Sequence, residues 1–128
     1  MTEMVRPDGT PVLILVAPYD QVTPRGTIFG GWIMAQIDHA AGLAGRKIAV
    51  GDVMIVSIKE LTFLGPLAPG EEFVIHTELT RRGNSSFTLS LSGTAEPVTE
   101  ARPVMQAEVV LVAVDAAGKP RKLPDPAA

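Results

Sequence analysis

One apolar stretch, residues 29–45, constrains the fold more than any other part of the chain. It opens with the glycine pair Gly30 and Gly31, is apolar on nearly every side, and carries a single carboxylate, Asp38. A helix that is apolar all round is buried in a core or a membrane. This stretch is too short and too interrupted to cross a bilayer, which needs about 20 apolar residues. We therefore expect a central helix, from about residue 31 to residue 47, that other elements surround.

Asp38 is the residue of this helix that needs an explanation. Asp is almost never fully buried unless it is paired, and we expect Asp38 to be buried against Ile37, Leu43 and Trp32. It can serve as a general base for a water molecule or attack a carbonyl carbon directly, and the residues do not decide between these roles. His39 points about 100° away from Asp38 on a helix and is expected to be structural or to lie in an interface.

The other apolar segments predict β-strands. The expected strands are residues 11–17, residues 53–64, residues 71–82, a strand carrying Phe87, Leu89 and Leu91, and residues 104–114. Residues 93–102 are expected to form a loop, and His76 is expected to be solvated on the polar face of its strand. Short connections favour antiparallel pairing. The prediction is an α+β fold in which a five-stranded antiparallel sheet wraps one long helix.

Composition limits the organisation and the partners. A chain of 128 residues is expected to form one domain, residues 1–128, with an N-terminal arm at residues 1–10 and a C-terminal surface tail at residues 119–128. A net charge of −3 gives no electrostatic case for nucleic acid, and the absence of cysteine excludes thiol catalysis and zinc–thiolate sites. No signal peptide is recognised, so we expect a cytoplasmic protein that does not bind a membrane.

The segment 26–38, Gly-Thr-Ile-Phe-Gly-Gly-Trp-Ile-Met-Ala-Gln-Ile-Asp, resembles the signature of the hotdog-fold acyl-CoA thioesterases, and it is most similar to their small bacterial YciA-like branch. Three further regions resemble the family in the same order: residues 61–71 its second strand and turn, residues 82–86 its hairpin, and residues 98–100, 112–115 and 118–124 its C-terminal strand and exit. Together the resemblance covers most of residues 17–124.

The resemblance implies hydrolysis of acyl-CoA to a free carboxylic acid and CoA. It places the family's catalytic carboxylate on Asp38 and its active sites at the interface of a homodimer, with a trimer of dimers expected for this branch. CoA is part of the substrate, so no separate cofactor is expected. No spacing of metal ligands is recognised in the sequence.

The sequence departs from the family pattern at three places. The family's Asn in the loop before the glycine pair falls on Thr23, or on Gln21 if the loop holds one extra residue. Lys59 and Glu60 replace an acidic residue followed by a small hydroxyl residue, and Asn84 replaces the hairpin Arg. A second function therefore stays open, that of a non-catalytic acyl-CoA-binding or regulatory hotdog protein. A dehydratase of this fold is disfavoured because it needs a His near the helix start.

Thioester hydrolysis needs a nucleophilic water and donors aimed at the developing oxyanion. The backbone N–H groups of Gly30 and Gly31, at a helix N-terminus, are candidates for the oxyanion site. Asp38 lies seven residues beyond Gly31, which is about 10 Å along the helix, so the two cannot hold one carbonyl within a single chain. We therefore expect a composite site across a two-fold axis.

Polar and basic residues near the strand ends are candidates for contact with the phosphates of CoA. Arg82, Lys119 and Arg121 supply positive charge. Asn84 and Ser85 occupy the position of the family's hairpin, and they complete the predicted CoA-binding set.

Overall fold

The computed structural model describes residues 11–97 and 99–126. The helix and the strands in this part of the chain are, in order, β1 Leu13–Val16, α1 Gly30–Ala49, β2 Val53–Phe63, β3 Glu72–Arg82, β4 Ser86–Glu96 and β5 Arg102–Ala113. The predicted order of elements, one strand, one long helix and then four strands, is confirmed. The predicted N-terminal arm, residues 1–10, lies outside the described residues.

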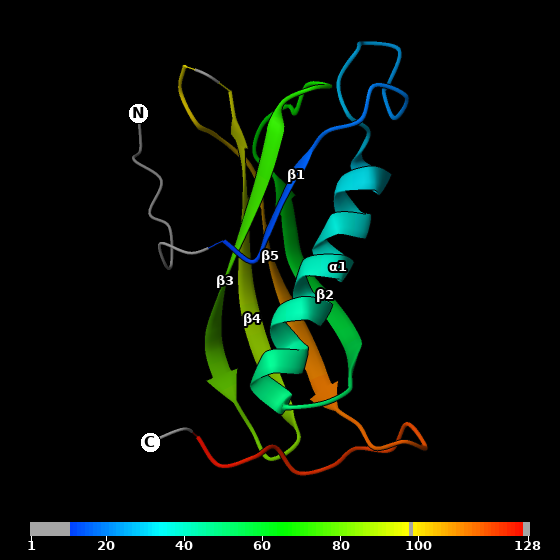
Figure 1. Cartoon of the computed structure of the whole chain (residues 1–128), viewed down its shortest axis with the longest axis vertical. Helices are drawn as coiled ribbons and strands as arrows, with labels where there is room; N and C mark the ends of the chain where they lie inside the picture. The colour runs from blue at the N-terminus through cyan, green and yellow to red at the C-terminus, as the bar shows by residue number, and fades with distance from the viewer. Residues whose placement is uncertain (1–10, 98, 127–128) are drawn as a thin grey trace.

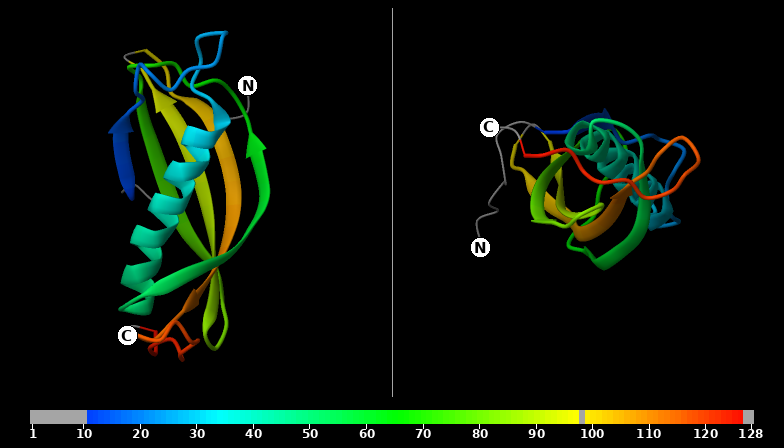
Figure 2. Two further views of the ribbon diagram at one scale, coloured as in Figure 1. Left: turned by 90° about the vertical axis from the view of Figure 1, so that its right-hand side faces the viewer. Right: turned by 90° about the horizontal axis from the view of Figure 1, so that it is seen from below.

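The strands form one antiparallel sheet in the order β1-β3-β4-β5-β2. Figure 1 shows α1 lying along this sheet, and the two views of Figure 2 show that the sheet curves around the helix, with β1 and β2 on either side of it. This arrangement confirms the predicted five-stranded antiparallel sheet around one helix. It also leaves the helix side that faces away from the sheet without a second layer.

Small and branched side chains form the face of α1 that rests on the sheet. The buried residues of this face recur at helical spacing: Ile33, Ile37, Ala40, Ala41 and Ala44. Gly45 lies in the closest contact, because a Cβ atom there would come within 2.9 Å of Leu111 Cδ2 and 3.4 Å of Phe87 Cζ. The lack of a side chain at Gly45 therefore lets the helix approach the sheet closely.

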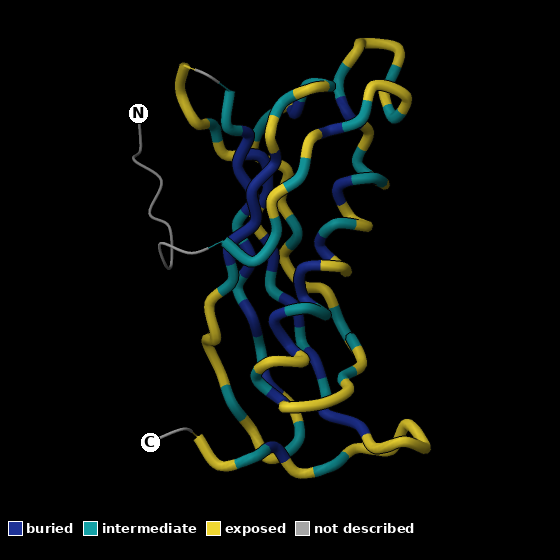
Figure 3. Tube along the Cα trace, in the orientation of Figure 1, coloured by how far each residue is buried: buried dark blue, intermediate teal, exposed yellow. Residues whose placement is uncertain are grey.

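The opposite face of α1 is open, so the prediction of a helix buried on every side is wrong for the single chain. Met34, Asp38, His39 and Arg46 are exposed along this face, as the yellow segments of the helix in Figure 3 show. One curved sheet can cover only one side of a helix, which explains the difference. No helix in the described part of the chain has the length and apolar character to cross a membrane.

The loop predicted over residues 93–102 is shorter in the structure, because β4 continues to Glu96 and β5 begins at Arg102. Gly93, predicted to begin the loop, lies within β4 and makes room for a ring, since a Cβ atom there would lie only 2.8 Å from the ring of Phe73. The glycine is therefore explained by packing under Phe73.

His76 is buried, with only 1% of its surface exposed, so the prediction of a solvated His76 is wrong. Alternation along β3 puts His76 on the outer face of the sheet together with Val74, which is 4% exposed. The cross-strand partner of His76 is Ser92. The outer face is therefore covered at this point, and a polar residue in the alternating pattern does not mark contact with solvent.

The C-terminal segment passes beneath the end of α1 and the β3–β4 turn (Figure 1). Leu123 is 4% exposed, and its N–H donates to the carbonyl of Asn84 at 2.8 Å. Val114 and Pro120 form an isolated antiparallel bridge. The described part of the predicted surface tail, residues 119–126, is therefore packed against the body of the domain.

β2 forms one edge of the sheet, and no described strand pairs with its outer side. Exposed apolar side chains gather along this strand: Met54, Val56, Ile58 and Phe63. The register against β5 shifts twice, and Glu60, at the second shift, has a left-handed φ of 52°. An open apolar edge of this kind is a template for pairing with another strand.

Candidate active site

A hollow lies at the N-terminus of α1, where the loop of residues 18–29 meets the connection from β2 to β3. Gly30 and Thr23 line this hollow together with Arg25 and Phe63. Gly31 occupies the next helical position and is exposed. The structure thus brings Thr23 and the start of the helix together, whereas Gln21, the alternative to Thr23, is not among the lining residues.

The first turn of α1 presents backbone N–H groups that no side chain caps. Phe29 precedes the helix in an extended conformation, with φ −77° and ψ 153°, and the first turn contains no acidic residue. The Trp32 N–H donates to the Phe29 carbonyl at 3.1 Å, but no acceptor among residues 11–97 and 99–126 takes the N–H of Gly30 or Gly31. Such a helix end attracts negative charge, so it is suited to an oxyanion.

Packing supplies a second reason for the glycine pair. A Cβ atom at Gly30 would lie 3.3 Å from Phe63 Cζ, and one at Gly31 would lie 3.2 Å from Phe29 Cε2. Both distances are tighter than ordinary van der Waals contact. A Cβ atom at either position would therefore require the facing aromatic ring to move by a few tenths of an ångström, and glycine avoids this shift.

Thr23 is held in a tight turn of the loop. Its N–H donates to the Thr27 carbonyl at 2.8 Å, and its own carbonyl accepts the Gly26 N–H at 2.8 Å. Its hydroxyl accepts the Arg25 N–H at 3.2 Å and lies 3.3 Å from the Thr27 hydroxyl. These bonds fix the loop against the hollow, and Thr23 takes part in that local network.

Asp38 lies on the exposed face of α1, so its predicted burial against Ile37, Leu43 and Trp32 is wrong for the single chain. Successive residues are rotated by about 100° around a helix. Because Ile37 packs on the sheet, with none of its surface exposed, Asp38 is turned away from it. The carboxylate is therefore available to solvent, to a substrate or to a second chain.

A second hollow contains Asp38. The other lining residues from α1 include His39, Gly42 and Arg46, and β2 contributes residues 53–55 at its beginning. Phe63, at the opposite end of β2, lines the hollow at the helix N-terminus instead. Asp38 and Gly30 thus belong to separate hollows, eight residues or about 12 Å apart along the helix.

The predicted CoA-binding residues gather at the other end of the molecule, beneath the C-terminus of α1 (Figure 1). Arg82, Asn84 and Ser85 lie at the β3–β4 turn, and Lys119 and Arg121 lie in the C-terminal segment that crosses it. An Arg82 N–H donates to the carbonyl of Pro124, which links the two segments. The structure therefore brings these five residues to one end of the fold.

Arg121 has a structural role that the sequence did not reveal. Its guanidinium donates to the carbonyls of Val114 at 2.9 Å, Ala49 at 3.1 Å and Asp52 at 3.3 Å. Ala49 is the last residue of α1, so Arg121 satisfies one of the carbonyls that a helix C-terminus leaves without a partner. Lys119, by contrast, is exposed, and its backbone pairs with Asp115.

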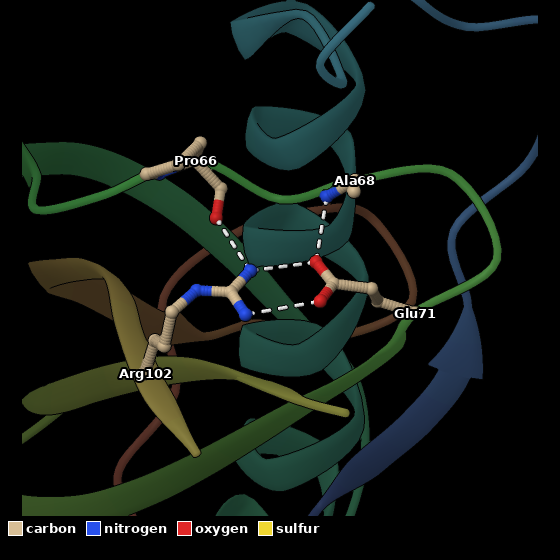
Figure 4. Close-up of polar contacts among 4 residues, drawn as sticks. All are labelled: Pro66, Ala68, Glu71 and Arg102. Atoms are coloured by element: carbon tan, nitrogen blue, oxygen red, sulfur yellow. Dashed lines mark hydrogen bonds and ion pairs between the residues drawn. The ribbon is translucent and has the colours of Figure 1, made fainter. Parts of the chain in front are cut away.

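An ion pair that the sequence pattern does not reveal, Glu71–Arg102, lies near the first hollow (Figure 4). The Arg102 guanidinium bonds both carboxylate oxygens of Glu71, at 2.7 and 3.0 Å. Glu71 Oε1 also accepts the Ala68 N–H at 2.8 Å, and Arg102 donates to the Pro66 carbonyl at 3.2 Å. Thirty-one positions separate the two charges, so only the fold brings them together.

The chain matches a family model described as the thioesterase superfamily over residues 25–101, more than half of its length. The acyl-CoA thioester hydrolase YciA of Salmonella typhimurium is 33% identical to it over 123 residues, covering 92% of each chain. The chain belongs to the thioesterase superfamily. The family resemblance predicted from the sequence is therefore confirmed.

Solved structures of thioesterases have the same fold. The hexameric thioesterase y2039 from Yersinia pestis is 35% identical, with a TM-score of 0.88 over 93% of this chain and 98% of that one. Cj0915, a hexameric hotdog fold thioesterase of Campylobacter jejuni, is 30% identical, with a TM-score of 0.85 over 91% of this chain and 92% of that one. The predicted hotdog fold is confirmed.

Replacement of Arg121 tests its structural role in this thioesterase. Arg121→Gln should lower the free energy of unfolding by about 1–2 kcal/mol, because it leaves carbonyls at the helix end without their charged donor. Urea denaturation followed by circular dichroism measures this change. The neighbouring exposed Lys122→Gln variant is the control and should unfold like the wild type. Equal stability of all three proteins would contradict the role.

The Glu71–Arg102 pair predicts a pH dependence of stability. The hydrogen bond from Arg102, aided by the Ala68 N–H, holds the pKa of Glu71 below its ordinary value of 4.5 against the opposing effect of burial. A carboxylate whose pKa is lower in the folded state stabilises the protein above its unfolded pKa, and this stabilisation is lost as pH falls through the folded pKa.

Thermal unfolding of the wild type and of Glu71→Gln across acidic pH tests this linkage. The stability advantage of the wild type should stay constant above about pH 5 and shrink at lower pH. A Glu72→Gln variant controls for the loss of one negative charge at the next position, the first residue of β3. An advantage that grew as the pH fell would show that the carboxylate is not held ionised by Arg102.

Proposed function

We propose that this chain hydrolyses acyl-CoA thioesters to carboxylic acids and CoA, at sites that two copies of the chain build together. Membership of the thioesterase superfamily supports the reaction class, and the Salmonella typhimurium relative is an acyl-CoA thioester hydrolase. Asp38 and Gly30 lie in separate hollows that border opposite ends of β2, and this position supports a site shared by two copies.

The observation that carries the proposal is the position of the two hollows at opposite ends of one open edge strand. The Asp38 hollow borders residues 53–55 at the beginning of β2, and the Gly30 hollow borders Phe63 at its end. If two copies of β2 pair antiparallel about a two-fold axis near Ile58, the beginning of one strand lies beside the end of the other. Each Asp38 hollow then faces the partner's helix N-terminus.

The same pairing covers the apolar edge that the single chain leaves open. Met54, Val56 and Ile58, between 39% and 53% exposed, would be buried by a second copy. The solved relatives from Yersinia pestis and Campylobacter jejuni are hexameric. We accordingly propose a homodimer through β2 as the catalytic unit, and a trimer of such dimers as the full assembly.

In this site the chemistry divides between the two copies. Asp38 of one copy takes a proton from water as the water attacks the thioester carbonyl, and the N–H groups of Gly30 and Gly31 of the other copy stabilise the oxyanion. The C–S bond then breaks, and the CoA thiolate leaves with the proton that Asp38 took. In direct attack, Asp38 displaces the CoA thiolate to give an acyl anhydride, which water then hydrolyses, and this route uses the same geometry. Thr23 borders the oxyanion side through its place in the loop network.

The cluster at the opposite end of the molecule is the proposed contact for the phosphates of CoA. Arg82, Lys119 and Arg121 bring three positive charges to this end, and the turn residues Asn84 and Ser85 add hydrogen-bonding groups. Arg121 also holds the helix end, so its loss would affect stability as well as binding. Lys119 is free of that structural role and is the cleaner probe of phosphate contact.

Asp38→Asn tests the reaction. The amide has nearly the same shape but cannot accept a proton from water, so kcat on a panel of acyl-CoA chain lengths should fall at least about 100-fold. Release of CoA is followed with a thiol reagent, and oligomer mass is checked by light scattering. Asp125→Asn, an exposed charge-matched change, should keep wild-type turnover.

Unchanged turnover by Asp38→Asn would remove Asp38 from the mechanism. If the wild type binds acyl-CoA but releases no CoA at any chain length, the alternative function applies. The chain would then be a non-catalytic acyl-CoA-binding or regulatory protein of the same fold.

A further inference from the structure

We propose that Glu71 and Arg102 are positioning residues of the proposed hydrolysis. Together they hold the segment that borders the start of α1 in the position that the reaction requires. The inference rests on the proposed function, because it assigns these residues to the oxyanion side of that site. Neither of them is among the residues that line either hollow. They act through the connection between β2 and β3, residues 64–71.

The pair contacts this connection on both sides of Leu67. Arg102 donates to the Pro66 carbonyl, and Glu71 accepts the Ala68 N–H, while the two charges bond each other through both carboxylate oxygens (Figure 4). The ion pair therefore spans the connection and fixes the backbone just before and just after Leu67.

Leu67 passes this constraint to the helix start. Its side chain is fully buried, and its carbonyl accepts the Ile28 N–H at 2.8 Å. Ile28 lies two residues before Gly30, and both line the hollow together with Phe63, Pro66 and Leu67 itself. One hydrogen bond thus connects the segment that Glu71 and Arg102 hold to the residues that lead directly into the proposed oxyanion site.

Among residues 11–97 and 99–126, the other backbone N–H groups of this connection that donate hydrogen bonds lie at its two ends, and they include the Glu71 N–H, which donates to the Ala68 carbonyl at 3.2 Å. At its beginning, the Leu64 N–H donates to the Val104 carbonyl at 2.7 Å, and at its end the Gly70 N–H donates to the Ala17 carbonyl at 2.8 Å. Between them stand Pro66 and Pro69, which have no N–H to donate. Side-chain contacts from Glu71 and Arg102 fill this gap.

The position of the pair favours a role in placement over one in bulk stability. The side chain of Arg102 is 39% exposed, and that of Glu71 is 16% exposed. Partly exposed ion pairs contribute at most about 1 kcal/mol to stability in general, which is compatible with the modest pH-dependent stabilisation expected above. Small displacements of groups that stabilise a transition state, in contrast, reduce turnover strongly. Loss of the pair should therefore lower kcat more than it changes KM.

The test compares Glu71→Gln and Arg102→Lys with the matched control Glu72→Gln in the full oligomeric protein. Glu71→Gln and Arg102→Lys should each lose about tenfold in kcat, with KM changed less than about twofold. In hydrogen exchange, the Ile28 amide should exchange about tenfold faster in both variants than in the control. The control should match the wild type in each measurement.

A charge-reversed double variant, Glu71→Arg with Arg102→Glu, distinguishes the contacts with the backbone of Pro66 and Ala68 from the attraction between the two charges. It restores the attraction, but an Arg at position 71 cannot accept the Ala68 N–H, and a Glu at position 102 cannot donate to the Pro66 carbonyl. If the backbone contacts position the segment, kcat should stay low in this variant. Recovery of wild-type kcat would show that only the attraction between the two positions matters, and would overturn the proposal.

The proposal also fails if both single variants keep kcat within about twofold of the wild type, or if Ile28 exchanges at the control rate in them. If the wild type hydrolyses no acyl-CoA at all, the proposed function fails instead. The exchange rate of Ile28 then still decides whether Glu71 and Arg102 hold the helix start.

Discussion

The close contact between one face of α1 and the concave side of the sheet is the constraint on which the rest of the structure depends. Ala40, Ala41 and Gly45 keep that face small, and Gly45 sits where a single added carbon would meet Leu111. Burial of this face fixes the rotation of the helix. Asp38 must then point away from the sheet, toward the side that the single chain leaves uncovered.

The same constraint separates the two halves of the proposed chemistry. A rigid helix holds Asp38 about 12 Å from the N–H groups at its own start, and each group opens into a hollow of its own. The open edge of β2 runs between these hollows. The proposed antiparallel pairing of two such edges would solve both problems, since it would cover exposed apolar side chains and bring each carboxylate to the partner's helix start.

The sequence pattern was sufficient for the order of the elements and for the antiparallel sheet, because apolar periodicity and turn residues act locally. The family was predicted from the resemblance of several motifs in the same order. The pattern failed where distant contacts decide the outcome. Gly93 was predicted to begin a loop, yet it lies within β4, where the ring of Phe73 leaves no room for a side chain. His76 occupied a polar position of a strand whose outer face is covered. The rotation of Asp38, the helix-end contacts of Arg121 and the meeting of Glu71 with Arg102 all depend on packing between segments far apart in the chain.

Mixed assemblies of two inactive variants test the shared site most directly. Asp38→Asn removes the carboxylate, and Gly30→Pro removes one N–H. The backbone at this first helical position, after the extended Phe29, suits proline, and the added ring requires only a small shift of the exposed Phe63 side chain. A dimer with one subunit of each kind has one intact composite site, so co-expression should restore about a quarter of wild-type turnover. If mixed assemblies form, as confirmed by mass, and remain as inactive as either variant alone, each site lies within one chain and the account is contradicted.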